Sequence, residues 1–483
     1  MIPLLDAVEM RAMETEAIAQ WGISSLVLQE HAALGALALL PPGQSLQVLA
    51  GPGNNGGDAL ALARLAKLRG ETVEVWTLGP NPVWHGDAAH QAALWEGLGG
   101  TYRHTTAPEQ VLSSFRGWVV DGLFGLGVRL PLTGLGAAWA NALHEAVLKG
   151  EAAFRVLALD LPSGLDPSSA EVLGVPVLAH RTACFGHLKR CHGLRPAQSY
   201  CGETTRIPIP LRAEVQAAVW RLETPEFSPR CAWNGYKGQA GHVAIRAGSS
   251  GMSGAAVLAA LGALRMGAGL VTVLVDAELR SEIASQIPEA MVHVWNGTIP
   301  EGVDALLVGP GGVGDIPVWT GPLVLDASAL RPGEGARWMQ RPRTVITPHA
   351  GEFTRLFSLE TALSTSTEER LQQARLRAQG PGILVLKGAQ TLIGGGDLDQ
   401  IWVNPTGHPG LSTGGTGDFL AGMVVANMAH WAQQGQGLEG LRRAVAEAVW
   451  LHGAAADRLG EGPLLVRDLG VSLAAILRDM HEH

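Results

Sequence analysis

The chain has 483 residues, of which 47% are hydrophobic and 16% are charged. This balance supplies ample material for large buried cores and argues against a disordered chain, and the length favours roughly two or three domains. The formal net charge is -9 and no Lys/Arg-rich run is present, so the sequence gives no support for a nucleic-acid partner.

Targeting and redox signals are weak throughout the chain. The nearest candidate for a membrane span, 32–40, stops at Pro41 and Pro42 and is too short to cross a membrane. The first 11 residues lack the basic and apolar segments of a signal peptide. The cysteines form no C-x-x-C pair and fit no standard zinc pattern; they are Cys184, Cys191, Cys201 and Cys231. We expect reduced structural thiols in a soluble cytoplasmic protein that assembles as a homo-oligomer without a membrane partner.

The first predicted elements form a strand-helix-strand unit. A β-rich run at 45–50 is followed by a glycine loop, a helix at 59–69 and a second strand at 72–78, an order typical of a parallel sheet. Two further apolar runs, 118–120 and 156–159, are predicted to be buried strands. Each of them runs into an aspartate, Asp121 or Asp160.

This rhythm breaks between residues 211 and 233, where prolines lie among charged residues and no strong strand is predicted. We interpret 216–232 as a linker between a domain at 1–215 and a domain at 233–483. A second series of short β-rich runs follows, with helical stretches such as 255–265 between them: 242–247, 270–275, 305–308, 323–325, 344–346 and 383–386. The sequence therefore predicts two α/β domains, each with a mostly parallel sheet.

Ligands of such sheets bind at the carboxyl ends of the strands. The first strand is followed there by Gly-Pro-Gly-Asn-Asn-Gly-Gly-Asp at 51–58. Glycines allow a ligand to approach the backbone, and a helix N-terminus favours an anion. The loop is neither a dinucleotide fingerprint nor a P-loop. By itself it is equally compatible with a tight turn that Asp58 caps.

Two other strand ends strengthen the ligand interpretation. Asp121 opens a glycine-rich turn that ends at Arg129, and Asp160 is followed by Leu-Pro-Ser-Gly-Leu-Asp. If the strands are neighbours, Asn55, Asp121 and the Ser163 carbonyl converge. These hard, weakly charged oxygen ligands suit K⁺ better than zinc. Asp160 is then free to act as a general base, although a single strand-end aspartate is also compatible with a cap or turn role.

These three motifs, in this order, closely resemble those of NAD(P)HX epimerases over residues 1–215, including Phe185-Gly186 and Lys189. The resemblance implies a Rossmann-like three-layer sandwich with K⁺ at Asn55, Asp121 and Ser163. It also implies Asp160 as the catalytic residue. It places the hydrated cofactor against Asn54, Asn55, Gly56, Gly57, Asp58, Phe124, Gly125, Leu126, Gly127, Val128, Arg129, Leu130 and Asp160. The chain departs from the family pattern at Leu126, at Ala59 and over 29–33.

A second glycine loop, Ser-Thr-Gly-Gly-Thr-Gly-Asp at 412–418, precedes an apolar helix predicted at 419–429. Successive backbone N–H groups at a helix start form an anion hole. Asp418 at its mouth is placed to exchange a proton with a bound hydroxyl. The alternative is a simple turn in which Asp418 is the N-cap.

Other strand ends of the second series carry candidate partners. Lys387 could bind a nucleotide phosphate or be a surface lysine, and a lone His349 is more often structural than catalytic. Asp326 ends one strand, and the glycine loop 309–314 follows another.

Together with Lys237-Gly-Gln-Ala-Gly and Ser253-Gly-Ala-Ala, these motifs look like those of ADP-dependent NAD(P)HX dehydratases over residues 230–483. The resemblance implies a ribokinase-like three-layer domain in which Asp418 is catalytic. It places the hydrated cofactor at Ala255, Gly312, His349 and Asp418. It places ADP, with Mg²⁺ as a further candidate, at Lys387, Gly388, Ala389, Gln390, Thr391 and Gly417. Ser328 departs from the family's usual aspartate.

The sequence as a whole therefore predicts a bifunctional repair enzyme for hydrated NADH and NADPH, with an isomerase domain and a lyase domain. Two alternatives stay open at this point. A ribokinase-like domain could instead phosphorylate a pyridoxal- or thiazole-type heterocycle, because the Gly-Thr-Gly-Asp loop alone does not distinguish the two. The chain could also bind nucleotides without catalysis, although its intact strand-end aspartates argue against that.

Overall fold

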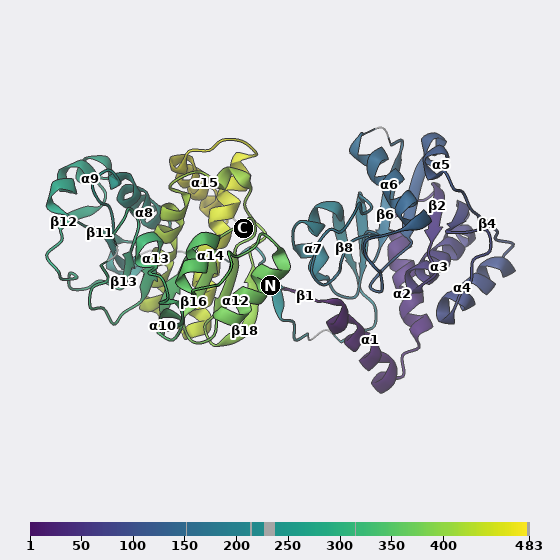
Figure 1. Ribbon diagram of the computed structural model, residues 1–483, viewed down its shortest axis with the longest axis horizontal. Helices are drawn as coiled ribbons and strands as arrows, with labels where there is room; N and C mark the ends of the chain where they lie inside the picture. The colour runs from purple at the N-terminus through teal and green to yellow at the C-terminus, as the bar shows by residue number, and fades with distance from the viewer. Residues whose placement is uncertain (151, 213–214, 227–236, 314, 481–483) are drawn as a thin grey trace. The chain divides into compact units, whose positions relative to one another are not determined.

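The computed structural model describes residues 1–150, 152–212, 215–226, 237–313 and 315–480. The chain divides into two compact units (Figure 1), one formed by Ile2–Val219 and the other by Met1 with Trp220–His483. Each unit contains a mostly parallel sheet with helices packed on it, which confirms the predicted α/β class.

The first unit is built on a seven-stranded parallel sheet in the order β4-β3-β2-β5-β6-β7-β8. The unit also contains β1 (Ile2–Leu4). The sheet strands are β2 (Ser45–Ala50), β3 (Thr72–Thr77), β4 (Tyr102–Arg103), β5 (Gly117–Gly122), β6 (Phe154–Leu159), β7 (Arg181–Phe185) and β8 (Glu203–Ile207). The helices are α1 (Ala7–Trp21), α2 (Ser25–Ala38), α3 (Asn54–Leu68), α4 (Gly86–Gly97), α5 (Pro108–Ser114), α6 (Gly134–Leu148) and α7 (Arg190–Gly193).

Alternate residues of the central strands pack into two separate cores. Trp118 and Val120 of β5 join a cluster with α2, α3 and α4, whereas Val119 joins a cluster on the other face with α5 and α6. Successive strand side chains point to opposite faces, so a central strand covered by helices on both faces becomes apolar throughout. The result is a three-layer sandwich whose loops meet at the carboxyl edge of the sheet.

In the second unit the strands lie in the order β18-β17-β16-β15-β14-β13-β10-β11-β12, with only β17 and β18 antiparallel to their neighbours. Their bounds are β10 (His242–Arg246), β11 (Leu270–Val275), β12 (Met291–Val294), β13 (Ala305–Val308), β14 (Leu323–Leu325), β15 (Thr344–Ile346), β16 (Ile383–Leu386), β17 (Leu392–Gly395) and β18 (Leu398–Val403). The helices are α8 (Ser253–Arg265), α9 (Arg280–Gln286), α10 (Gly335–Met339), α11 (Ala350–Leu356), α12 (Thr367–Arg377), α13 (Thr416–Gln434), α14 (Leu438–Leu459) and α15 (Val466–Asp479).

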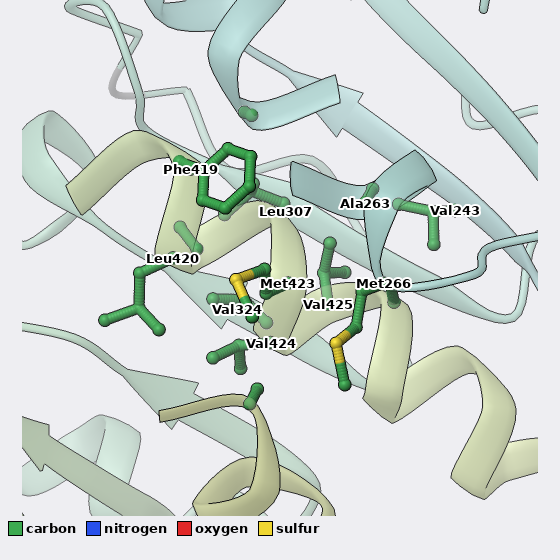
Figure 2. Packing of buried hydrophobic residues seen from close by; sticks show 14 of the residues in the cluster. Val243, Ala263, Met266, Leu307, Val324, Phe419, Leu420, Met423, Val424 and Val425 are labelled. Atoms are coloured by element: carbon green, nitrogen blue, oxygen red, sulfur yellow. The ribbon is translucent and has the colours of Figure 1, made fainter. Parts of the chain in front are cut away.

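The core of the second unit forms where α8 and α13 pack on the sheet (Figure 2). Met423, Val424 and Val425 of α13 lie near Val243 of β10 and Val324 of β14. The two helices approach closely because each presents a glycine to the other. A Cβ on Gly262 would lie 2.1 Å from the Phe419 carbonyl oxygen, and one on Gly422 would lie 2.0 Å from that of Ala259. This contact fixes where α13 begins, and with it the loop before it.

The predicted linker at 216–232 contains a short strand, β9 (Val219–Arg221), which the sequence pattern did not indicate. Just after it, the backbone N–H of Leu222 donates to the carbonyl of Val403 at 3.0 Å. The part of the predicted linker from 227 onward lies outside the described residues.

Candidate active sites

The first candidate site lies at the carboxyl edge of the first sheet, where β2, β5 and β6 are neighbours. A cavity of about 710 Å³ opens there, and residues of all three predicted loops line it. Those predicted from the sequence are Asn54, Asn55, Asp58, Phe124, Gly125, Leu126, Gly127, Val128, Arg129 and Asp160. Gly56, Gly57 and Leu130 belong to the same loops but are not among the lining residues.

Gly56 has a structural reason to be glycine. A Cβ at this position would lie 1.7 Å from the carbonyl oxygen of Gly51, so the turn that starts α3 closes only without a side chain. Ala59, a departure from the family pattern, is fully buried. It faces Gly122, where an added Cβ would lie 2.4 Å from the Ala59 Cβ. The absence of a side chain at Gly122 therefore makes room for alanine at 59.

Asn55, Asp121 and Ser163 come together around the backbone of Phe124. Asn55 Nδ2 donates to the Phe124 carbonyl at 3.0 Å, and the Phe124 N–H donates to Ser163 Oγ at 3.0 Å. Ser163 donates to Asp121 through Oγ at 2.7 Å and through its backbone N–H at 2.8 Å. The three residues predicted as cation ligands are thus neighbours in space.

The chemistry of this cluster fits a hard cation of low charge. Burial raises the pKa of Asp121 to about 6, although its hydrogen bonds from Ser163 lower it. Asn55 Oδ1 is buried and has no hydrogen-bond partner among the described residues. The Ser163 carbonyl accepts one hydrogen bond, from the Val177 N–H at 2.9 Å, and keeps a second lone pair. A buried carboxylate and an amide oxygen without a hydrogen-bond partner are oxygen ligands of the kind that K⁺ would bind.

Asp160 is held more firmly than the sequence suggested. Its backbone has a φ of 63°, a conformation that side chains other than glycine rarely adopt. Oδ1 forms an ion pair with Lys189 Nζ and accepts from the Phe185 N–H at 3.3 Å. The structure therefore differs from the expectation of a free carboxylate. Oδ2 makes no hydrogen bond in the described part of the chain and is available at the cavity.

Lys189 lies completely buried beneath the cavity. Besides Asp160, its Nζ donates to the Phe185 carbonyl at 2.7 Å and contacts Cys184 Sγ at 3.7 Å. Burial acts to lower the pKa of Lys189, but the charge and hydrogen bond of Asp160, together with Cys184 and Cys191, outweigh burial, and the pKa is raised. The Lys189 ammonium therefore lies against one side of the Asp160 carboxyl group.

The cavity also contains an acid that sequence reasoning missed. Glu14 of α1 lines it together with Arg11 and Ile18. Burial raises the pKa of Glu14, and the Asp160 carboxylate raises it further. Burial likewise raises the pKa of Asp58 well above its usual range. The spacing of 11, 14 and 18 places these side chains on one helix face, but nothing in the sequence shows where that face lies.

The second candidate site lies at the carboxyl edge of the second sheet. Lys387, Thr347, Asp326 and Gly309 follow β16, β15, β14 and β13, which are consecutive in the sheet. Lys387 Nζ donates to Asp326 Oδ1 at 2.8 Å, and Thr347 Oγ1 donates to the same oxygen at 2.7 Å. The strand order therefore brings together side chains that lie far apart in sequence.

The glycine loop before α13 reaches the same cluster. Gly415 is the N-cap of α13 and has a φ of 92°, so the alternative in which Asp418 caps the helix is wrong. A Cβ on Gly417 would lie 3.4 Å from Lys387 Nζ. The loop predicted to bind phosphate and the lysine predicted to assist it are thus side by side.

Asp418 lies in the first turn of α13 and faces this charged group. Burial raises the pKa of Asp418 to about 6, and the carboxylates of Asp326 and Glu352 act in the same direction, whereas Lys387 lowers it. Burial alone would lower the pKa of Lys387, but Asp326 and Glu352 outweigh it. Lys387 is therefore not an isolated surface lysine. Its positive charge already balances the buried carboxylates of Asp326 and Glu352 before any phosphate binds.

His349 is the N-cap of α11. Its Nδ1 accepts from the Gly351 N–H at 3.1 Å and from the Glu352 N–H at 3.4 Å. Glu352 Oε2 in return accepts from the His349 backbone N–H at 2.9 Å. This supports the structural interpretation of His349, although its ring remains partly exposed at the same edge of the sheet.

The remaining predicted contacts fall in two places. Ala255 lies next to the 309–313 loop, since a Cβ on Gly311 would be 3.0 Å from the Ala255 Cβ, and Gly312 faces Ser249. Gly388, Ala389, Gln390 and Thr391 form the turn between β16 and β17. Arg370 supports this turn by donating to the Gln390 carbonyl at 3.2 Å. Ser328 is exposed in the turn after Asp326.

Three further features of the described residues concern the cysteines, metal ligands and membrane spans. Cys184, Cys191 and Cys201 are buried free thiols, and Cys231 lies outside the described residues. In the described ranges, no group of three or more His, Cys, Asp or Glu side chains could hold a metal ion. The same ranges contain no helix long and apolar enough to cross a membrane.

Comparison with known proteins assigns a family to each unit. Residues 25–191 match the family described as YjeF-related protein N-terminus, and residues 243–477 match the family described as NAD(P)H-hydrate dehydratase. A bifunctional NAD(P)H-hydrate repair enzyme of Moorella thermoacetica is 32% identical over 99% of this chain and 97% of its own length. The enzyme of the same name from Coxiella burnetii is 34% identical over 95% of this chain and 96% of its own length.

Among solved structures, an ADP/ATP-dependent NAD(P)H-hydrate dehydratase from Bacillus subtilis, co-crystallised with ATP and Mg²⁺, is 30% identical. The match covers 52% of this chain and 93% of the Bacillus subtilis chain, with a TM-score of 0.44.

Fold and sites together define a two-domain α/β enzyme, with a Rossmann-like unit followed by a ribokinase-like unit. Because the similarity extends over nearly the full length of both relatives, the chain belongs to the family of bifunctional NAD(P)H-hydrate repair enzymes.

Proposed function

We propose that the chain restores hydrated NADH and NADPH in two steps, one in each unit. One observation carries the proposal. In each unit, a glycine loop and an aspartate lie together at the carboxyl edge of that unit's sheet. The first unit would interconvert the R and S hydrates, and the second would remove water from the S form. The pairing is useful because the second step consumes one epimer and the first supplies it from the other.

In the first unit, the loops at 54–58 and 124–130 would hold the hydrated cofactor, and Asp160 would move the proton. The ion pair with Lys189 orients the Asp160 carboxyl group. Asn55, Asp121 and the Ser163 carbonyl would hold K⁺, which would supply positive charge next to a bound phosphate. This ligand set is supported by the unpaired Asn55 Oδ1 and the buried Asp121.

In the second unit, hydroxide is a poor leaving group, so dehydration needs a positioned acid. Asp418 would donate the proton to the leaving hydroxyl. The N–H groups at the start of α13, with Lys387 to Thr391, would bind ADP together with Mg²⁺. Ala255, Gly312 and His349 would contact the hydrated cofactor.

The alternative is phosphate transfer to a small alcohol, since a ribokinase-like unit with a Gly-Thr-Gly-Asp loop is also compatible with a kinase. Full-length similarity to repair enzymes favours dehydration. The catalytic aspartate alone does not decide between the two, because a kinase would use the same side chain to accept a proton.

The direct test is recovery of reduced-nicotinamide absorbance from a mixture of R and S NADPHX. We expect recovery of the whole mixture with ADP and none without it. Recovery of only the S fraction would refute the first activity, and Leu126 would then be the first residue to examine. Absence of recovery with ADP, combined with phosphate transfer from ATP to pyridoxal or a thiazole alcohol, would establish the kinase instead.

A further inference from the structure

Helix α1 forms one wall of the first cavity and is fixed in place at its start. Asp6 caps the helix and forms an ion pair with Arg190 at 2.9 Å. One turn later, Arg11 Nη2 donates to the Leu126 carbonyl at 2.8 Å. Met10 packs against Gly186, where an added Cβ would lie 2.9 Å from the methionine methyl carbon. The face that carries Arg11 therefore turns Glu14 toward the cavity.

Glu14 differs from Asp58 and Asp160, the two acids of this cavity that interact with it electrostatically, in being unpaired. In the described part of the chain its carboxyl group makes no hydrogen bond and no ion pair, although the residue is partly buried. Asp160 is paired with Lys189, and Asp58 accepts a hydrogen bond from Gln29. The charged groups that face Glu14 are Asp58, Asp160, Lys189 and, on its own helix, Arg11.

Interconversion of two epimers needs a proton donor as well as an acceptor. Asp160 is placed to be one of the two groups, because Lys189 and the Phe185 N–H hold its Oδ1 at the lining of the cavity. A second group must act on the other face of the ring. A neutral carboxylic acid elsewhere in the cavity would complete the site, and burial next to a second carboxylate favours the neutral form of Glu14.

We propose that Glu14 is the proton donor of the first site, acting opposite the Asp160–Lys189 pair; this inference rests on the proposed epimerisation. Glu14 gives its proton to the ring hydroxyl as the C–O bond breaks. The bonding pair leaves with oxygen as water, and the lone pair of the ring nitrogen forms a C=N bond.

A water molecule then adds to the opposite face of the same carbon. The C=N electron pair returns to nitrogen, and Asp160 takes the proton that the water loses. Transfer of this proton back to Glu14 resets the site, so one water leaves, one enters and no redox change occurs. In the reverse direction the sequence of proton transfers is reversed.

The test is Glu14→Gln, assayed without ADP by separating R and S NADPHX over time and subtracting the spontaneous rate. Glutamine can fill the space but cannot donate a proton. We expect kcat for epimerisation to fall by about 100-fold or more while KM stays unchanged. Glu16→Gln is the matched control, because Glu16 lies on the same helix, pairs with Arg212 at 3.3 Å and is not among the residues lining the cavity.

The pH profile separates a donor from a structural residue. The donor must be protonated, so the rate of the unmodified chain should fall as pH rises through the pKa of Glu14. This high-pH limb should disappear in Glu14→Gln and persist, at a lower rate, in Glu14→Asp. Circular dichroism of both variants establishes that the first unit is folded.

Other outcomes would overturn the inference. A Glu14→Gln rate close to that of the unmodified chain would do so, as would a raised KM with an unchanged pH profile. Loss of the high-pH limb in Asp58→Asn, with the limb retained in Glu14→Gln, would assign the donor to Asp58. If the unmodified chain shows no epimerisation above the spontaneous rate, the proposed function of the first unit fails, and the inference fails with it.

Discussion

At the residue scale, the second site depends on one lysine surrounded by three carboxylates. Lys387 lies 2.8 Å from Asp326 and 3.9 Å from Glu352, and it opposes the rise in the pKa of Asp418. A carboxyl group with a pKa near 6 can be protonated close to neutral pH, which a proton donor requires. Lys387 would thus adjust the acidity of Asp418 as well as contact the nucleotide.

This arrangement predicts the pH dependence of dehydration. A donor with a pKa of about 6 loses its proton above that pH, so kcat for S NADPHX should fall as pH rises through about 6. Lys387→Met removes the cation that lowers the pKa of Asp418, so the fall in kcat should move to higher pH. The measurement is kcat against pH at saturating ADP, and a limb that stays in place would contradict this role for Lys387.

A second residue-scale prediction concerns K⁺. Burial raises the pKa of Asp121 to about 6, and a bound cation would favour the carboxylate, so binding should release a proton. Below about pH 6, protonation of Asp121 should weaken K⁺ binding. We expect KCl to raise the melting temperature and the epimerisation rate more at pH 8 than at pH 5, with choline chloride as the control. An equal response to both salts at both pH values would argue against the site.

The strand-end aspartates could be predicted because each follows a short apolar run. Their partners could not. Lys189 lies 29 residues from Asp160, and Lys387 lies 61 residues from Asp326. Such pairs depend on which strands become neighbours. Glu14 is a similar case, since its place at the cavity depends on how α1 docks and not on a local motif.

At the element scale, the α8–α13 contact positions the start of α13, which carries Asp418. Gly262→Ala would place a Cβ against the Phe419 carbonyl and should destabilise the second unit by about 1–3 kcal/mol. It should also raise the KM for ADP, because the start of α13 must move. The measurement is denaturant unfolding of the transition that ADP stabilises.

Gly254→Ala is the matched control in the same helix, because a Cβ there meets nothing within 4 Å. Alanine should leave the unfolding free energy unchanged or raise it by up to about 1 kcal/mol. Equal destabilisation by the two changes would mean that helix propensity, and not the close contact, determines the effect.

The interior strands were the most predictable elements. The strands β10, β11, β13, β14, β15 and β16 follow the predicted runs closely, because strands covered on both faces are apolar throughout. Strands β4, β9 and β18 were among those missed, and of these three only β4 lies at the edge of its sheet. Their partly exposed faces mix polar and apolar residues, and β4 and β9 are too short for a periodic pattern.

At the scale of the whole molecule, each unit has its own core and its own candidate site. The first site contains Asp160 at the end of β6, and the second contains Asp418 at the start of α13. No residue of one site belongs to the other unit. Single substitutions should therefore remove the two activities one at a time.

The most direct test compares Asp160→Asn and Asp418→Asn with the unmodified chain on a mixture of R and S NADPHX with ADP. Asp160→Asn should recover the S fraction as NADPH and leave the R fraction to spontaneous epimerisation. Asp418→Asn should recover no NADPH but still equilibrate R and S. If either substitution reduced both activities equally, the assignment of one reaction to each unit would be contradicted.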